Sequence, residues 1–262
     1  MSGDGVLLAV EDGVATLTLN RPDQGNALDL PMMRTFRAHA EALAERTDVR
    51  VVVLRGAGKM FCVGGDLGWM AAQEQRETAL RALADELHAA LLILRGLPAP
   101  VLAVAHSTAA GAGFSLVAGA DLSYVASSAR LTMAYTKVGL SPDGSSTWVL
   151  PRLIGQRRAA ELMLLNPSLT AEEAAGLGLI TRAVPDAELE DVVAQVVATL
   201  RDGSLAANAA VKRLLDASAT STFEDQVHRE AAEIAALAAG PEGREGVGAF
   251  LERRKPDFRG AA

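Results

Sequence analysis

The chain has 262 residues, half of them apolar, which is enough for one sizeable domain with its own core. Its formal net charge of −7 argues against general nucleic-acid binding, and its single cysteine excludes an internal disulfide. We expect a soluble, cytoplasmic protein without membrane contact, because no stretch of about 18 residues is free of Gly, Pro and charge and the N-terminus lacks a signal-peptide pattern.

Predicted strands and helices alternate through the first two thirds of the chain. Two alternating segments flank Asp12 and Gly13 and predict a β-hairpin, and Pro31 suits the first turn of a helix that runs to Ala44. Apolar runs rich in β-branched residues then predict buried parallel strands, and a helical pattern occupies residues 80–94. The expected strands are 6–10, 14–19, 51–55, 101–105 and 122–126. Repeated strand-to-helix units indicate an α/β fold.

The pattern becomes helical from Thr170 onward, beginning with a capping box formed by Thr170 and Glu173. Apolar residues then recur at helical spacing in residues 186–200, 204–217, 223–239 and 242–254. We therefore divide the chain into a core, residues 1–199, and a C-terminal helical subdomain, residues 200–262. No Pro/Gly-rich linker separates the two, so a continuation of one core remains the alternative.

Two glycine-bearing turns follow the predicted central strands and lead into helices, namely residues 61–67 and 109–115. A helix start leaves backbone N–H groups without intrahelical partners, and its dipole adds positive potential. Two such starts that face one point would stabilise a developing oxyanion. The turns therefore predict a site for enolate chemistry. Four scattered histidines predict no metal site.

The first turn and four further motifs resemble, in order and spacing, those of the crotonase superfamily of enoyl-CoA hydratases and isomerases. The motifs are residues 56–67, 20–22 with 26–28, 109–115, 176–185 and 245–256. The resemblance implies a spiral of repeated ββα units followed by an assembly subdomain for trimers or paired trimers. It also implies an acyl-CoA thioester as substrate, with coenzyme A entering as part of that substrate and no separate cofactor.

By this resemblance, the backbone amides of Gly65 and Ala112 are the two oxyanion donors. Small residues there let a thioester carbonyl approach the main chain. Further contacts to the substrate are implied for Ala27, Leu28, Val63, Asp66, Leu67 and Gly68. Phe250 and Arg253 match C-terminal positions that reach the coenzyme A of a neighbouring subunit. Arg253 has the simpler alternative of a solvated charge near a helix end.

The chain departs from the family pattern at both acid–base positions. Hydratases of the family use two glutamates, and the corresponding residues here are Ser115 and Tyr135. Neither is a carboxylate, so ordinary hydratase chemistry is not expected. Both side chains are candidates to orient substrate or water, although a tyrosine packed with its hydroxyl satisfied is the alternative.

Asp143 offers a carboxylate just before a predicted apolar helix. Its surroundings resemble those of the ring-epoxide isomerases of the family, and the equivalent carboxylate also occurs in dienoyl-CoA isomerases and chlorobenzoyl-CoA dehalogenases. We predict an enoyl-CoA or ring-epoxide acyl-CoA isomerase in which Asp143 shuttles the proton. The alternatives are a residual hydratase, a thioester hydrolase or dehalogenase with Asp143 as nucleophile, and a non-catalytic acyl-CoA-binding protein. Asp143 as a helix N-cap is the structural alternative.

Overall fold

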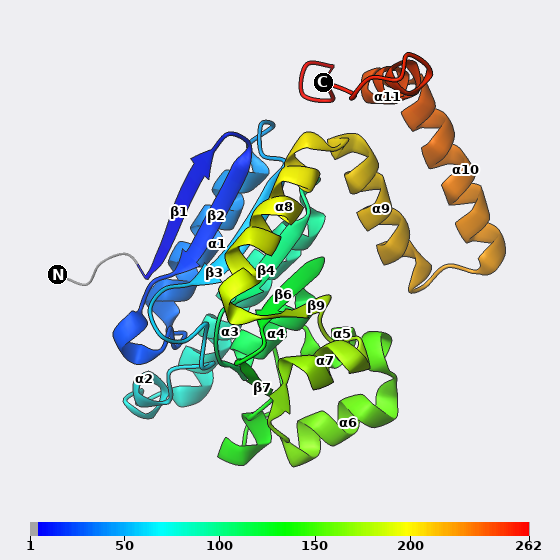
Figure 1. Ribbon diagram of the computed structural model, residues 1–262. Helices are drawn as coiled ribbons and strands as arrows, with labels where there is room; N and C mark the ends of the chain where they lie inside the picture. Colours follow the sequence, from blue (N-terminus) through cyan, green and yellow to red (C-terminus); the bar gives the residue numbers. More distant parts are fainter. Residues whose placement is uncertain (1–4, 262) are drawn as a thin grey trace.

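A six-stranded sheet forms the centre of the computed structural model, which describes residues 5–261 (Figure 1). Its strands lie in the order β1-β2-β3-β4-β6-β9, and all neighbours are parallel except the β1–β2 pair. Asp12 and Gly13 make the turn of that antiparallel pair, which confirms the predicted hairpin. The strands are β1 (Val6–Glu11), β2 (Val14–Leu19), β3 (Val51–Gly56), β4 (Val101–Ala105), β6 (Leu122–Ala126) and β9 (Arg182–Val184).

A second, three-stranded sheet lies beside the carboxyl ends of the central strands. It contains β5 (Ala109–Ala110), β7 (Arg130–Thr132) and β8 (Leu169–Thr170) in the order β5-β7-β8. The short strand β5 is part of the second glycine turn. Its pairing with β7 therefore holds that turn against the rest of the fold.

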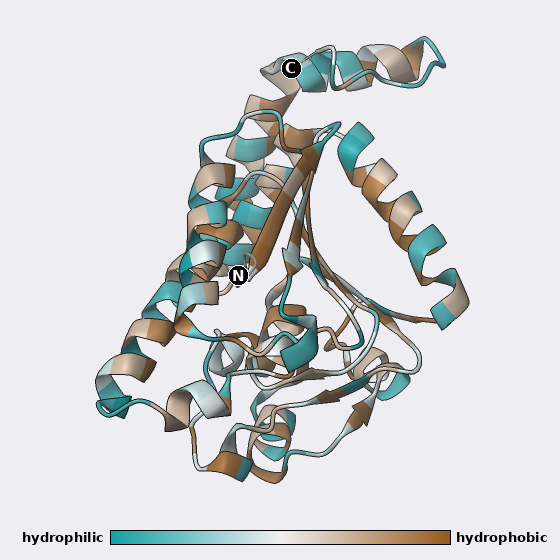
Figure 2. Cartoon of the chain, turned by 90° about the vertical axis from the view of Figure 1, so that its left-hand side faces the viewer, coloured by the Kyte–Doolittle hydropathy of each residue, from teal (hydrophilic) through white to brown (hydrophobic). Residues whose placement is uncertain are grey.

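Helices cover the central sheet, and teal and brown alternate along them, which shows that they are amphipathic (Figure 2). The capping box of Thr170 and Glu173 is present at the start of α7. The helices of this part are α1 (Leu30–Ala44), α2 (Leu67–Ala71), α3 (Arg76–Gly96), α4 (Ala112–Gly119), α5 (Ser146–Ile154), α6 (Gln156–Leu165) and α7 (Ala171–Leu177). Among residues 5–261, no helix combines the length and apolar character needed to cross a membrane.

Four helices complete the chain: α8 (Leu189–Asp202), α9 (Leu205–Ser218), α10 (Phe223–Ala239) and α11 (Pro241–Leu251). Leu189 and Val193 of α8 pack with the second face of the central sheet, whereas α10 buries none of its residues. In Figure 1, α10 and α11 project away from the sheets. The predicted boundary between residues 199 and 200 falls within the last turn of α8.

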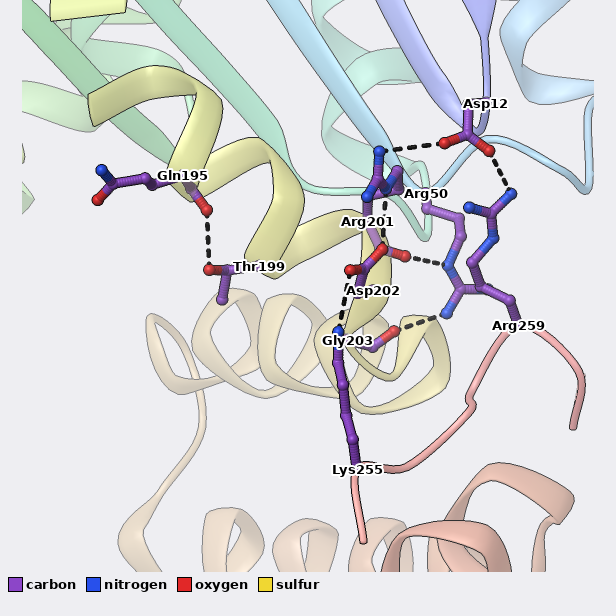
Figure 3. A network of polar contacts seen from close by, with 9 residues as sticks. All are labelled: Asp12, Arg50, Gln195, Thr199, Arg201, Asp202, Gly203, Lys255 and Arg259. Carbon is purple, nitrogen blue, oxygen red and sulfur yellow. Dashed lines mark hydrogen bonds and ion pairs between the residues drawn. The ribbon is translucent and has the colours of Figure 1, made fainter. Parts of the chain in front are cut away.

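Polar contacts join the end of α8 to the central sheet and to the C-terminal segment (Figure 3). The buried guanidinium of Arg50 donates to the carbonyl oxygens of Arg201 and Gly203, each at 2.6 Å. Asp12, in the turn of the hairpin, accepts from Arg201 at 3.0 Å and from Arg259 at 2.6 Å. These contacts fix the base from which α9 to α11 project.

Candidate active site

The first glycine turn is held by backbone pairing with Leu28. The amide of Leu28 donates to the carbonyl of Gly64 at 2.8 Å, and the carbonyl of Leu28 accepts from Asp66 at 2.9 Å. Gly64 has a φ of +97°, and a Cβ there would lie 2.9 Å from the carbonyl oxygen of Ala110. Only glycine tolerates this conformation and this close approach.

The second glycine turn packs directly on the first. Ala110 donates its amide to the carbonyl of Cys62 at 2.9 Å. A Cβ on Gly113 would lie 2.3 Å from the same carbonyl oxygen, so the start of α4 approaches the first turn more closely than a side chain allows. Within residues 5–261, neither Gly65 nor Ala112 donates its amide to another group. The fold therefore holds two free N–H donors side by side.

Both turns line a cavity of about 390 Å³. Seven of the residues predicted for the site line it, namely Leu28, Val63, Gly65, Leu67, Ala112, Tyr135 and Asp143. One wall consists of aliphatic side chains on α3, and Glu77, which is exposed, lies in its first turn. The cavity thus combines an apolar interior with two amide donors and the carboxylate of Asp143.

Asp143 is hydrogen bonded to both residues that occupy the expected glutamate positions. The hydroxyl of Tyr135 donates to Oδ1 of Asp143 at 2.7 Å. Ser115 donates to the backbone carbonyl of Asp143 at 3.1 Å, and its Oγ lies 3.1 Å from the Tyr135 hydroxyl. Burial, together with the charge of Asp143, raises the pKa of Tyr135 well above its ordinary value. Tyr135 is therefore a neutral donor that orients the carboxylate.

The carboxylate of Asp143 does not cap α5. The N-cap of this helix is Ser145, and no side chain hydrogen bonds to its first amides. Asp143 contributes only its backbone carbonyl, which accepts from the amide and hydroxyl of Ser146 at 3.2 and 2.8 Å. Because its side chain points to Tyr135, the N-cap interpretation does not describe it.

Six predicted site residues lie outside the lining of the cavity: Ala27, Asp66, Gly68, Ser115, Phe250 and Arg253. Asp66 instead caps α2 through the amide of Trp69 and pairs with Arg21 at 3.0 Å. Phe250, on α11, is 81% exposed. The cavity of the single chain therefore includes neither Phe250 nor Arg253.

Two features at or beside the cavity were not predicted. One is the stripe of Leu80, Leu83, Ala84 and Leu87 on α3, whose helical spacing is equally typical of a core. The other is His88, whose Nε2 lies 3.8 Å from Oδ2 of Asp143. No local signal in the sequence marks this histidine, since its partner is distant along the chain.

The described residues give little support for a thiol nucleophile or for a cluster of metal ligands at the site. Burial raises the pKa of the Cys62 thiol to about 12, which suits a packing residue and not a nucleophile. Over residues 5–261, no cluster of three or more His, Cys, Asp or Glu side chains is arranged to hold a metal ion.

Comparison with known proteins gives consistent matches over nearly the whole chain. The family model described as enoyl-CoA hydratase/isomerase matches residues 9–261. A Rhodobacter capsulatus protein described as a probable enoyl-CoA hydratase is 40% identical over 99% of this chain and 100% of its own length. The 1,2-epoxyphenylacetyl-CoA isomerase of Escherichia coli is 36% identical over 97% and 98%.

A crystal structure of an enoyl-CoA hydratase from Mycobacterium smegmatis superimposes with a TM-score of 0.90 at 35% identity, covering 97% of this chain and 99% of that one. This likeness and the family match confirm the predicted α/β spiral fold.

Proposed function

The chain belongs to the enoyl-CoA hydratase/isomerase family, and from its cavity we propose that it is an isomerase of enoyl-CoA or ring-epoxide acyl-CoA thioesters. The observation that carries this proposal is the environment of Asp143. The two positions at which hydratases of the family are expected to carry glutamates hold Ser115 and Tyr135, and both hydrogen bond to this one residue. A single carboxylate beside two free amides suits removal and return of one proton.

In the proposed reaction, the thioester oxygen accepts hydrogen bonds from the amides of Gly65 and Ala112. Asp143 removes a proton from the α or γ carbon of the acyl chain, and the negative charge passes to that oxygen as a dienolate. Return of the proton at the other end of the dienolate shifts the double bond. Preformed donors of this kind are worth about 100- to 1,000-fold in rate each. The substrate brings coenzyme A with it, and no step needs another cofactor.

Isotope labelling tests this proposal. The protein is incubated with 3-enoyl-CoA and 2-enoyl-CoA esters in deuterated water, and label and double-bond position are followed by mass spectrometry. We expect a shifted double bond in the wild type and a loss of at least about 100-fold in Asp143→Asn. The melting temperature should change little, because the carboxylate does not cap α5. Release of free CoA would instead support a nucleophilic Asp143.

Hydration of 2-enoyl-CoA is the second candidate. It is favoured by the R. capsulatus relative and by the presence of a second titratable side chain, His88, near Asp143. The same experiment separates the two candidates, because hydration yields a 3-hydroxyacyl-CoA of higher mass. That product, without double-bond migration, would replace the isomerase proposal.

We further propose that the protein assembles as a homotrimer or a pair of trimers through its C-terminal helices. Large apolar side chains on α10 and α11 support this, since Phe223, Ile234, Phe250 and Leu251 are 85%, 70%, 81% and 75% exposed. Light scattering on the purified protein measures the assembly. A monomer at micromolar concentration would contradict the proposal and leave Phe250 and Arg253 without a substrate contact.

A further inference from the structure

His88 contacts the residues around Asp143 from α3, and the mechanism above gives it no role. Its Nε2 accepts a hydrogen bond from the amide of Gly144 at 3.3 Å. In this contact Nε2 is the acceptor, so it is the ring nitrogen that can take up a proton. Tyr135 already donates to Oδ1 of Asp143, while Oδ2 lies 3.8 Å from Nε2 of His88. The two atoms are therefore neighbours, and Oδ2 is the oxygen of Asp143 that faces the imidazole.

A second cavity, of about 530 Å³, lies on the other side of Asp143. Among the described residues, Asp143 is the only one that lines both cavities. His88 lines the second cavity but not the first, and its side chain is 43% exposed. The imidazole is therefore reached by water from a side that the proposed substrate site does not occupy.

The other charged groups of the second cavity already have partners. Arg95 pairs with Asp216 and stacks over the ring of Trp148. Asp121 pairs with Lys212 at 2.8 Å. Asp143 is thus the carboxylate of this cavity that is left to interact with His88.

We propose that His88 exchanges the proton held by Asp143 with water in the second cavity. After Asp143 has taken a proton from substrate, Nε2 exchanges its hydrogen bond with the Gly144 amide for one from Oδ2–H. The Oδ2–H bond then breaks and an Nε2–H bond forms, which leaves a carboxylate and an imidazolium. The imidazolium exchanges its protons with water and returns a solvent-derived proton to Oδ2. His88 acts on the reaction only through Asp143, so it is a positioning residue. The inference rests on the proposed role of Asp143 as the base.

The proposed role of His88 affects proton exchange with water but not isomerisation, although both rates depend on Asp143. Isomerisation returns the abstracted proton to the substrate and needs no exchange with water. A saturated acyl-CoA neither isomerises nor hydrates, and its α protons become labelled in deuterated water only when the proton on Asp143 exchanges. The ratio of exchange to isomerisation therefore reports on His88, whereas a structural disturbance of Asp143 lowers both rates equally.

The experiment measures both rates, with a saturated medium-chain acyl-CoA and its 3-enoyl analogue, in wild type, His88→Gln and Asp143→Asn. Glutamine keeps an acceptor near the position of Nε2 for the Gly144 amide, but its amide group cannot take up a proton from Asp143 and release it to water. We expect His88→Gln to lower α-proton exchange at least about tenfold while isomerisation changes less than about threefold. His39→Gln is the matched control, because His39 lies on α1, contacts the carbonyl of Val6 on β1 and lies outside both cavities.

Equal losses of both rates in His88→Gln, or no loss of either, would overturn the inference. So would a wild type that does not exchange α protons, or an exchange that survives Asp143→Asn. Failure of the isomerase proposal gives a different result. In that case no double bond shifts, yet the exchange rate of the saturated thioester still falls in His88→Gln at unchanged thioester affinity, and the role of His88 stands.

Discussion

Replacing Gly113 by alanine is expected to force apart the two glycine turns. The new Cβ would lie 2.3 Å from the carbonyl oxygen of Cys62 and 2.7 Å from its Cβ, whereas ordinary contact begins at 3.4 Å. The first turn of α4 must therefore move by about 1 Å, at a cost of about 1–3 kcal/mol in unfolding free energy. Because Ala112 precedes this residue, its amide moves with it, and a misplacement of about 1 Å costs about 100-fold in rate.

Two measurements test this expectation: kcat for double-bond migration in a 3-enoyl-CoA, and the free energy of unfolding in urea. Gly176→Ala is the matched control, since Gly176 lies in α7 and a Cβ there meets no atom within 4 Å. We expect it to keep the wild-type rate and to gain up to about 1 kcal/mol of stability. A Gly113→Ala protein with wild-type kcat and stability would refute the argument that this contact sets the spacing of the two amides.

Three further predictions concern the oxyanion donors, the tyrosine and the base of the C-terminal helices. Ala112→Pro removes the backbone N–H at the first residue of α4, a position where proline is tolerated, and should lower kcat about 100- to 1,000-fold. An unchanged kcat would exclude this N–H as an oxyanion donor. The raised pKa of Tyr135 means that the folded state holds its proton more tightly than the unfolded state, so its contribution to stability is complete below about pH 10 and declines above it. Urea unfolding from about pH 9 to 11 should therefore show a smaller alkaline loss in Tyr135→Phe, and an equal loss would contradict this. Arg50→Met leaves the buried carboxylate of Glu242, 3.5 Å away, without its cation and should lower the free energy of unfolding in urea by about 3–5 kcal/mol. Arg46→Met, at the exposed pair with Asp48, should lower it by less than about 1 kcal/mol. Similar losses in both variants would show that burial is not the cause.

The parts of the fold that the sequence predicts well are those with a local signal. Buried parallel strands such as β3 and β4 are short apolar runs because both of their faces are covered. The hairpin depends on Asp12 and Gly13, which both adopt a positive φ, and the start of α7 depends on its capping box. Each of these features is determined by residues that are close together in the chain.

The walls of the cavity could not be predicted in the same way. The stripe of Leu80, Leu83 and Leu87 has the spacing of a core-facing helix, and only the packing of α3 opposite the glycine turns exposes part of it to the cavity. His88 has the same limitation, because the Gly144 amide that it binds is 56 residues away. Such contacts depend on the path of the whole chain, for which a single sequence gives no direct signal.

The two departures from the family pattern and the carboxylate of Asp143 form one arrangement. Ser115, on α4, is 2% exposed. A Cβ added to Gly144 would lie 2.9 Å from the Cβ of Ser115, so the loop before α5 packs against α4 without space between them. A glutamate at position 115 would need that space and would bring a second carboxylate beside Asp143, which costs free energy both through overpacking and through repulsion. The small serine therefore lets the loop approach, and the loop brings its own carboxylate to the cavity, where Tyr135 orients it. In the proposed reaction the acid–base group therefore lies on this loop and not on α4, and the chemistry that we propose depends on Asp143 and on the groups that touch it.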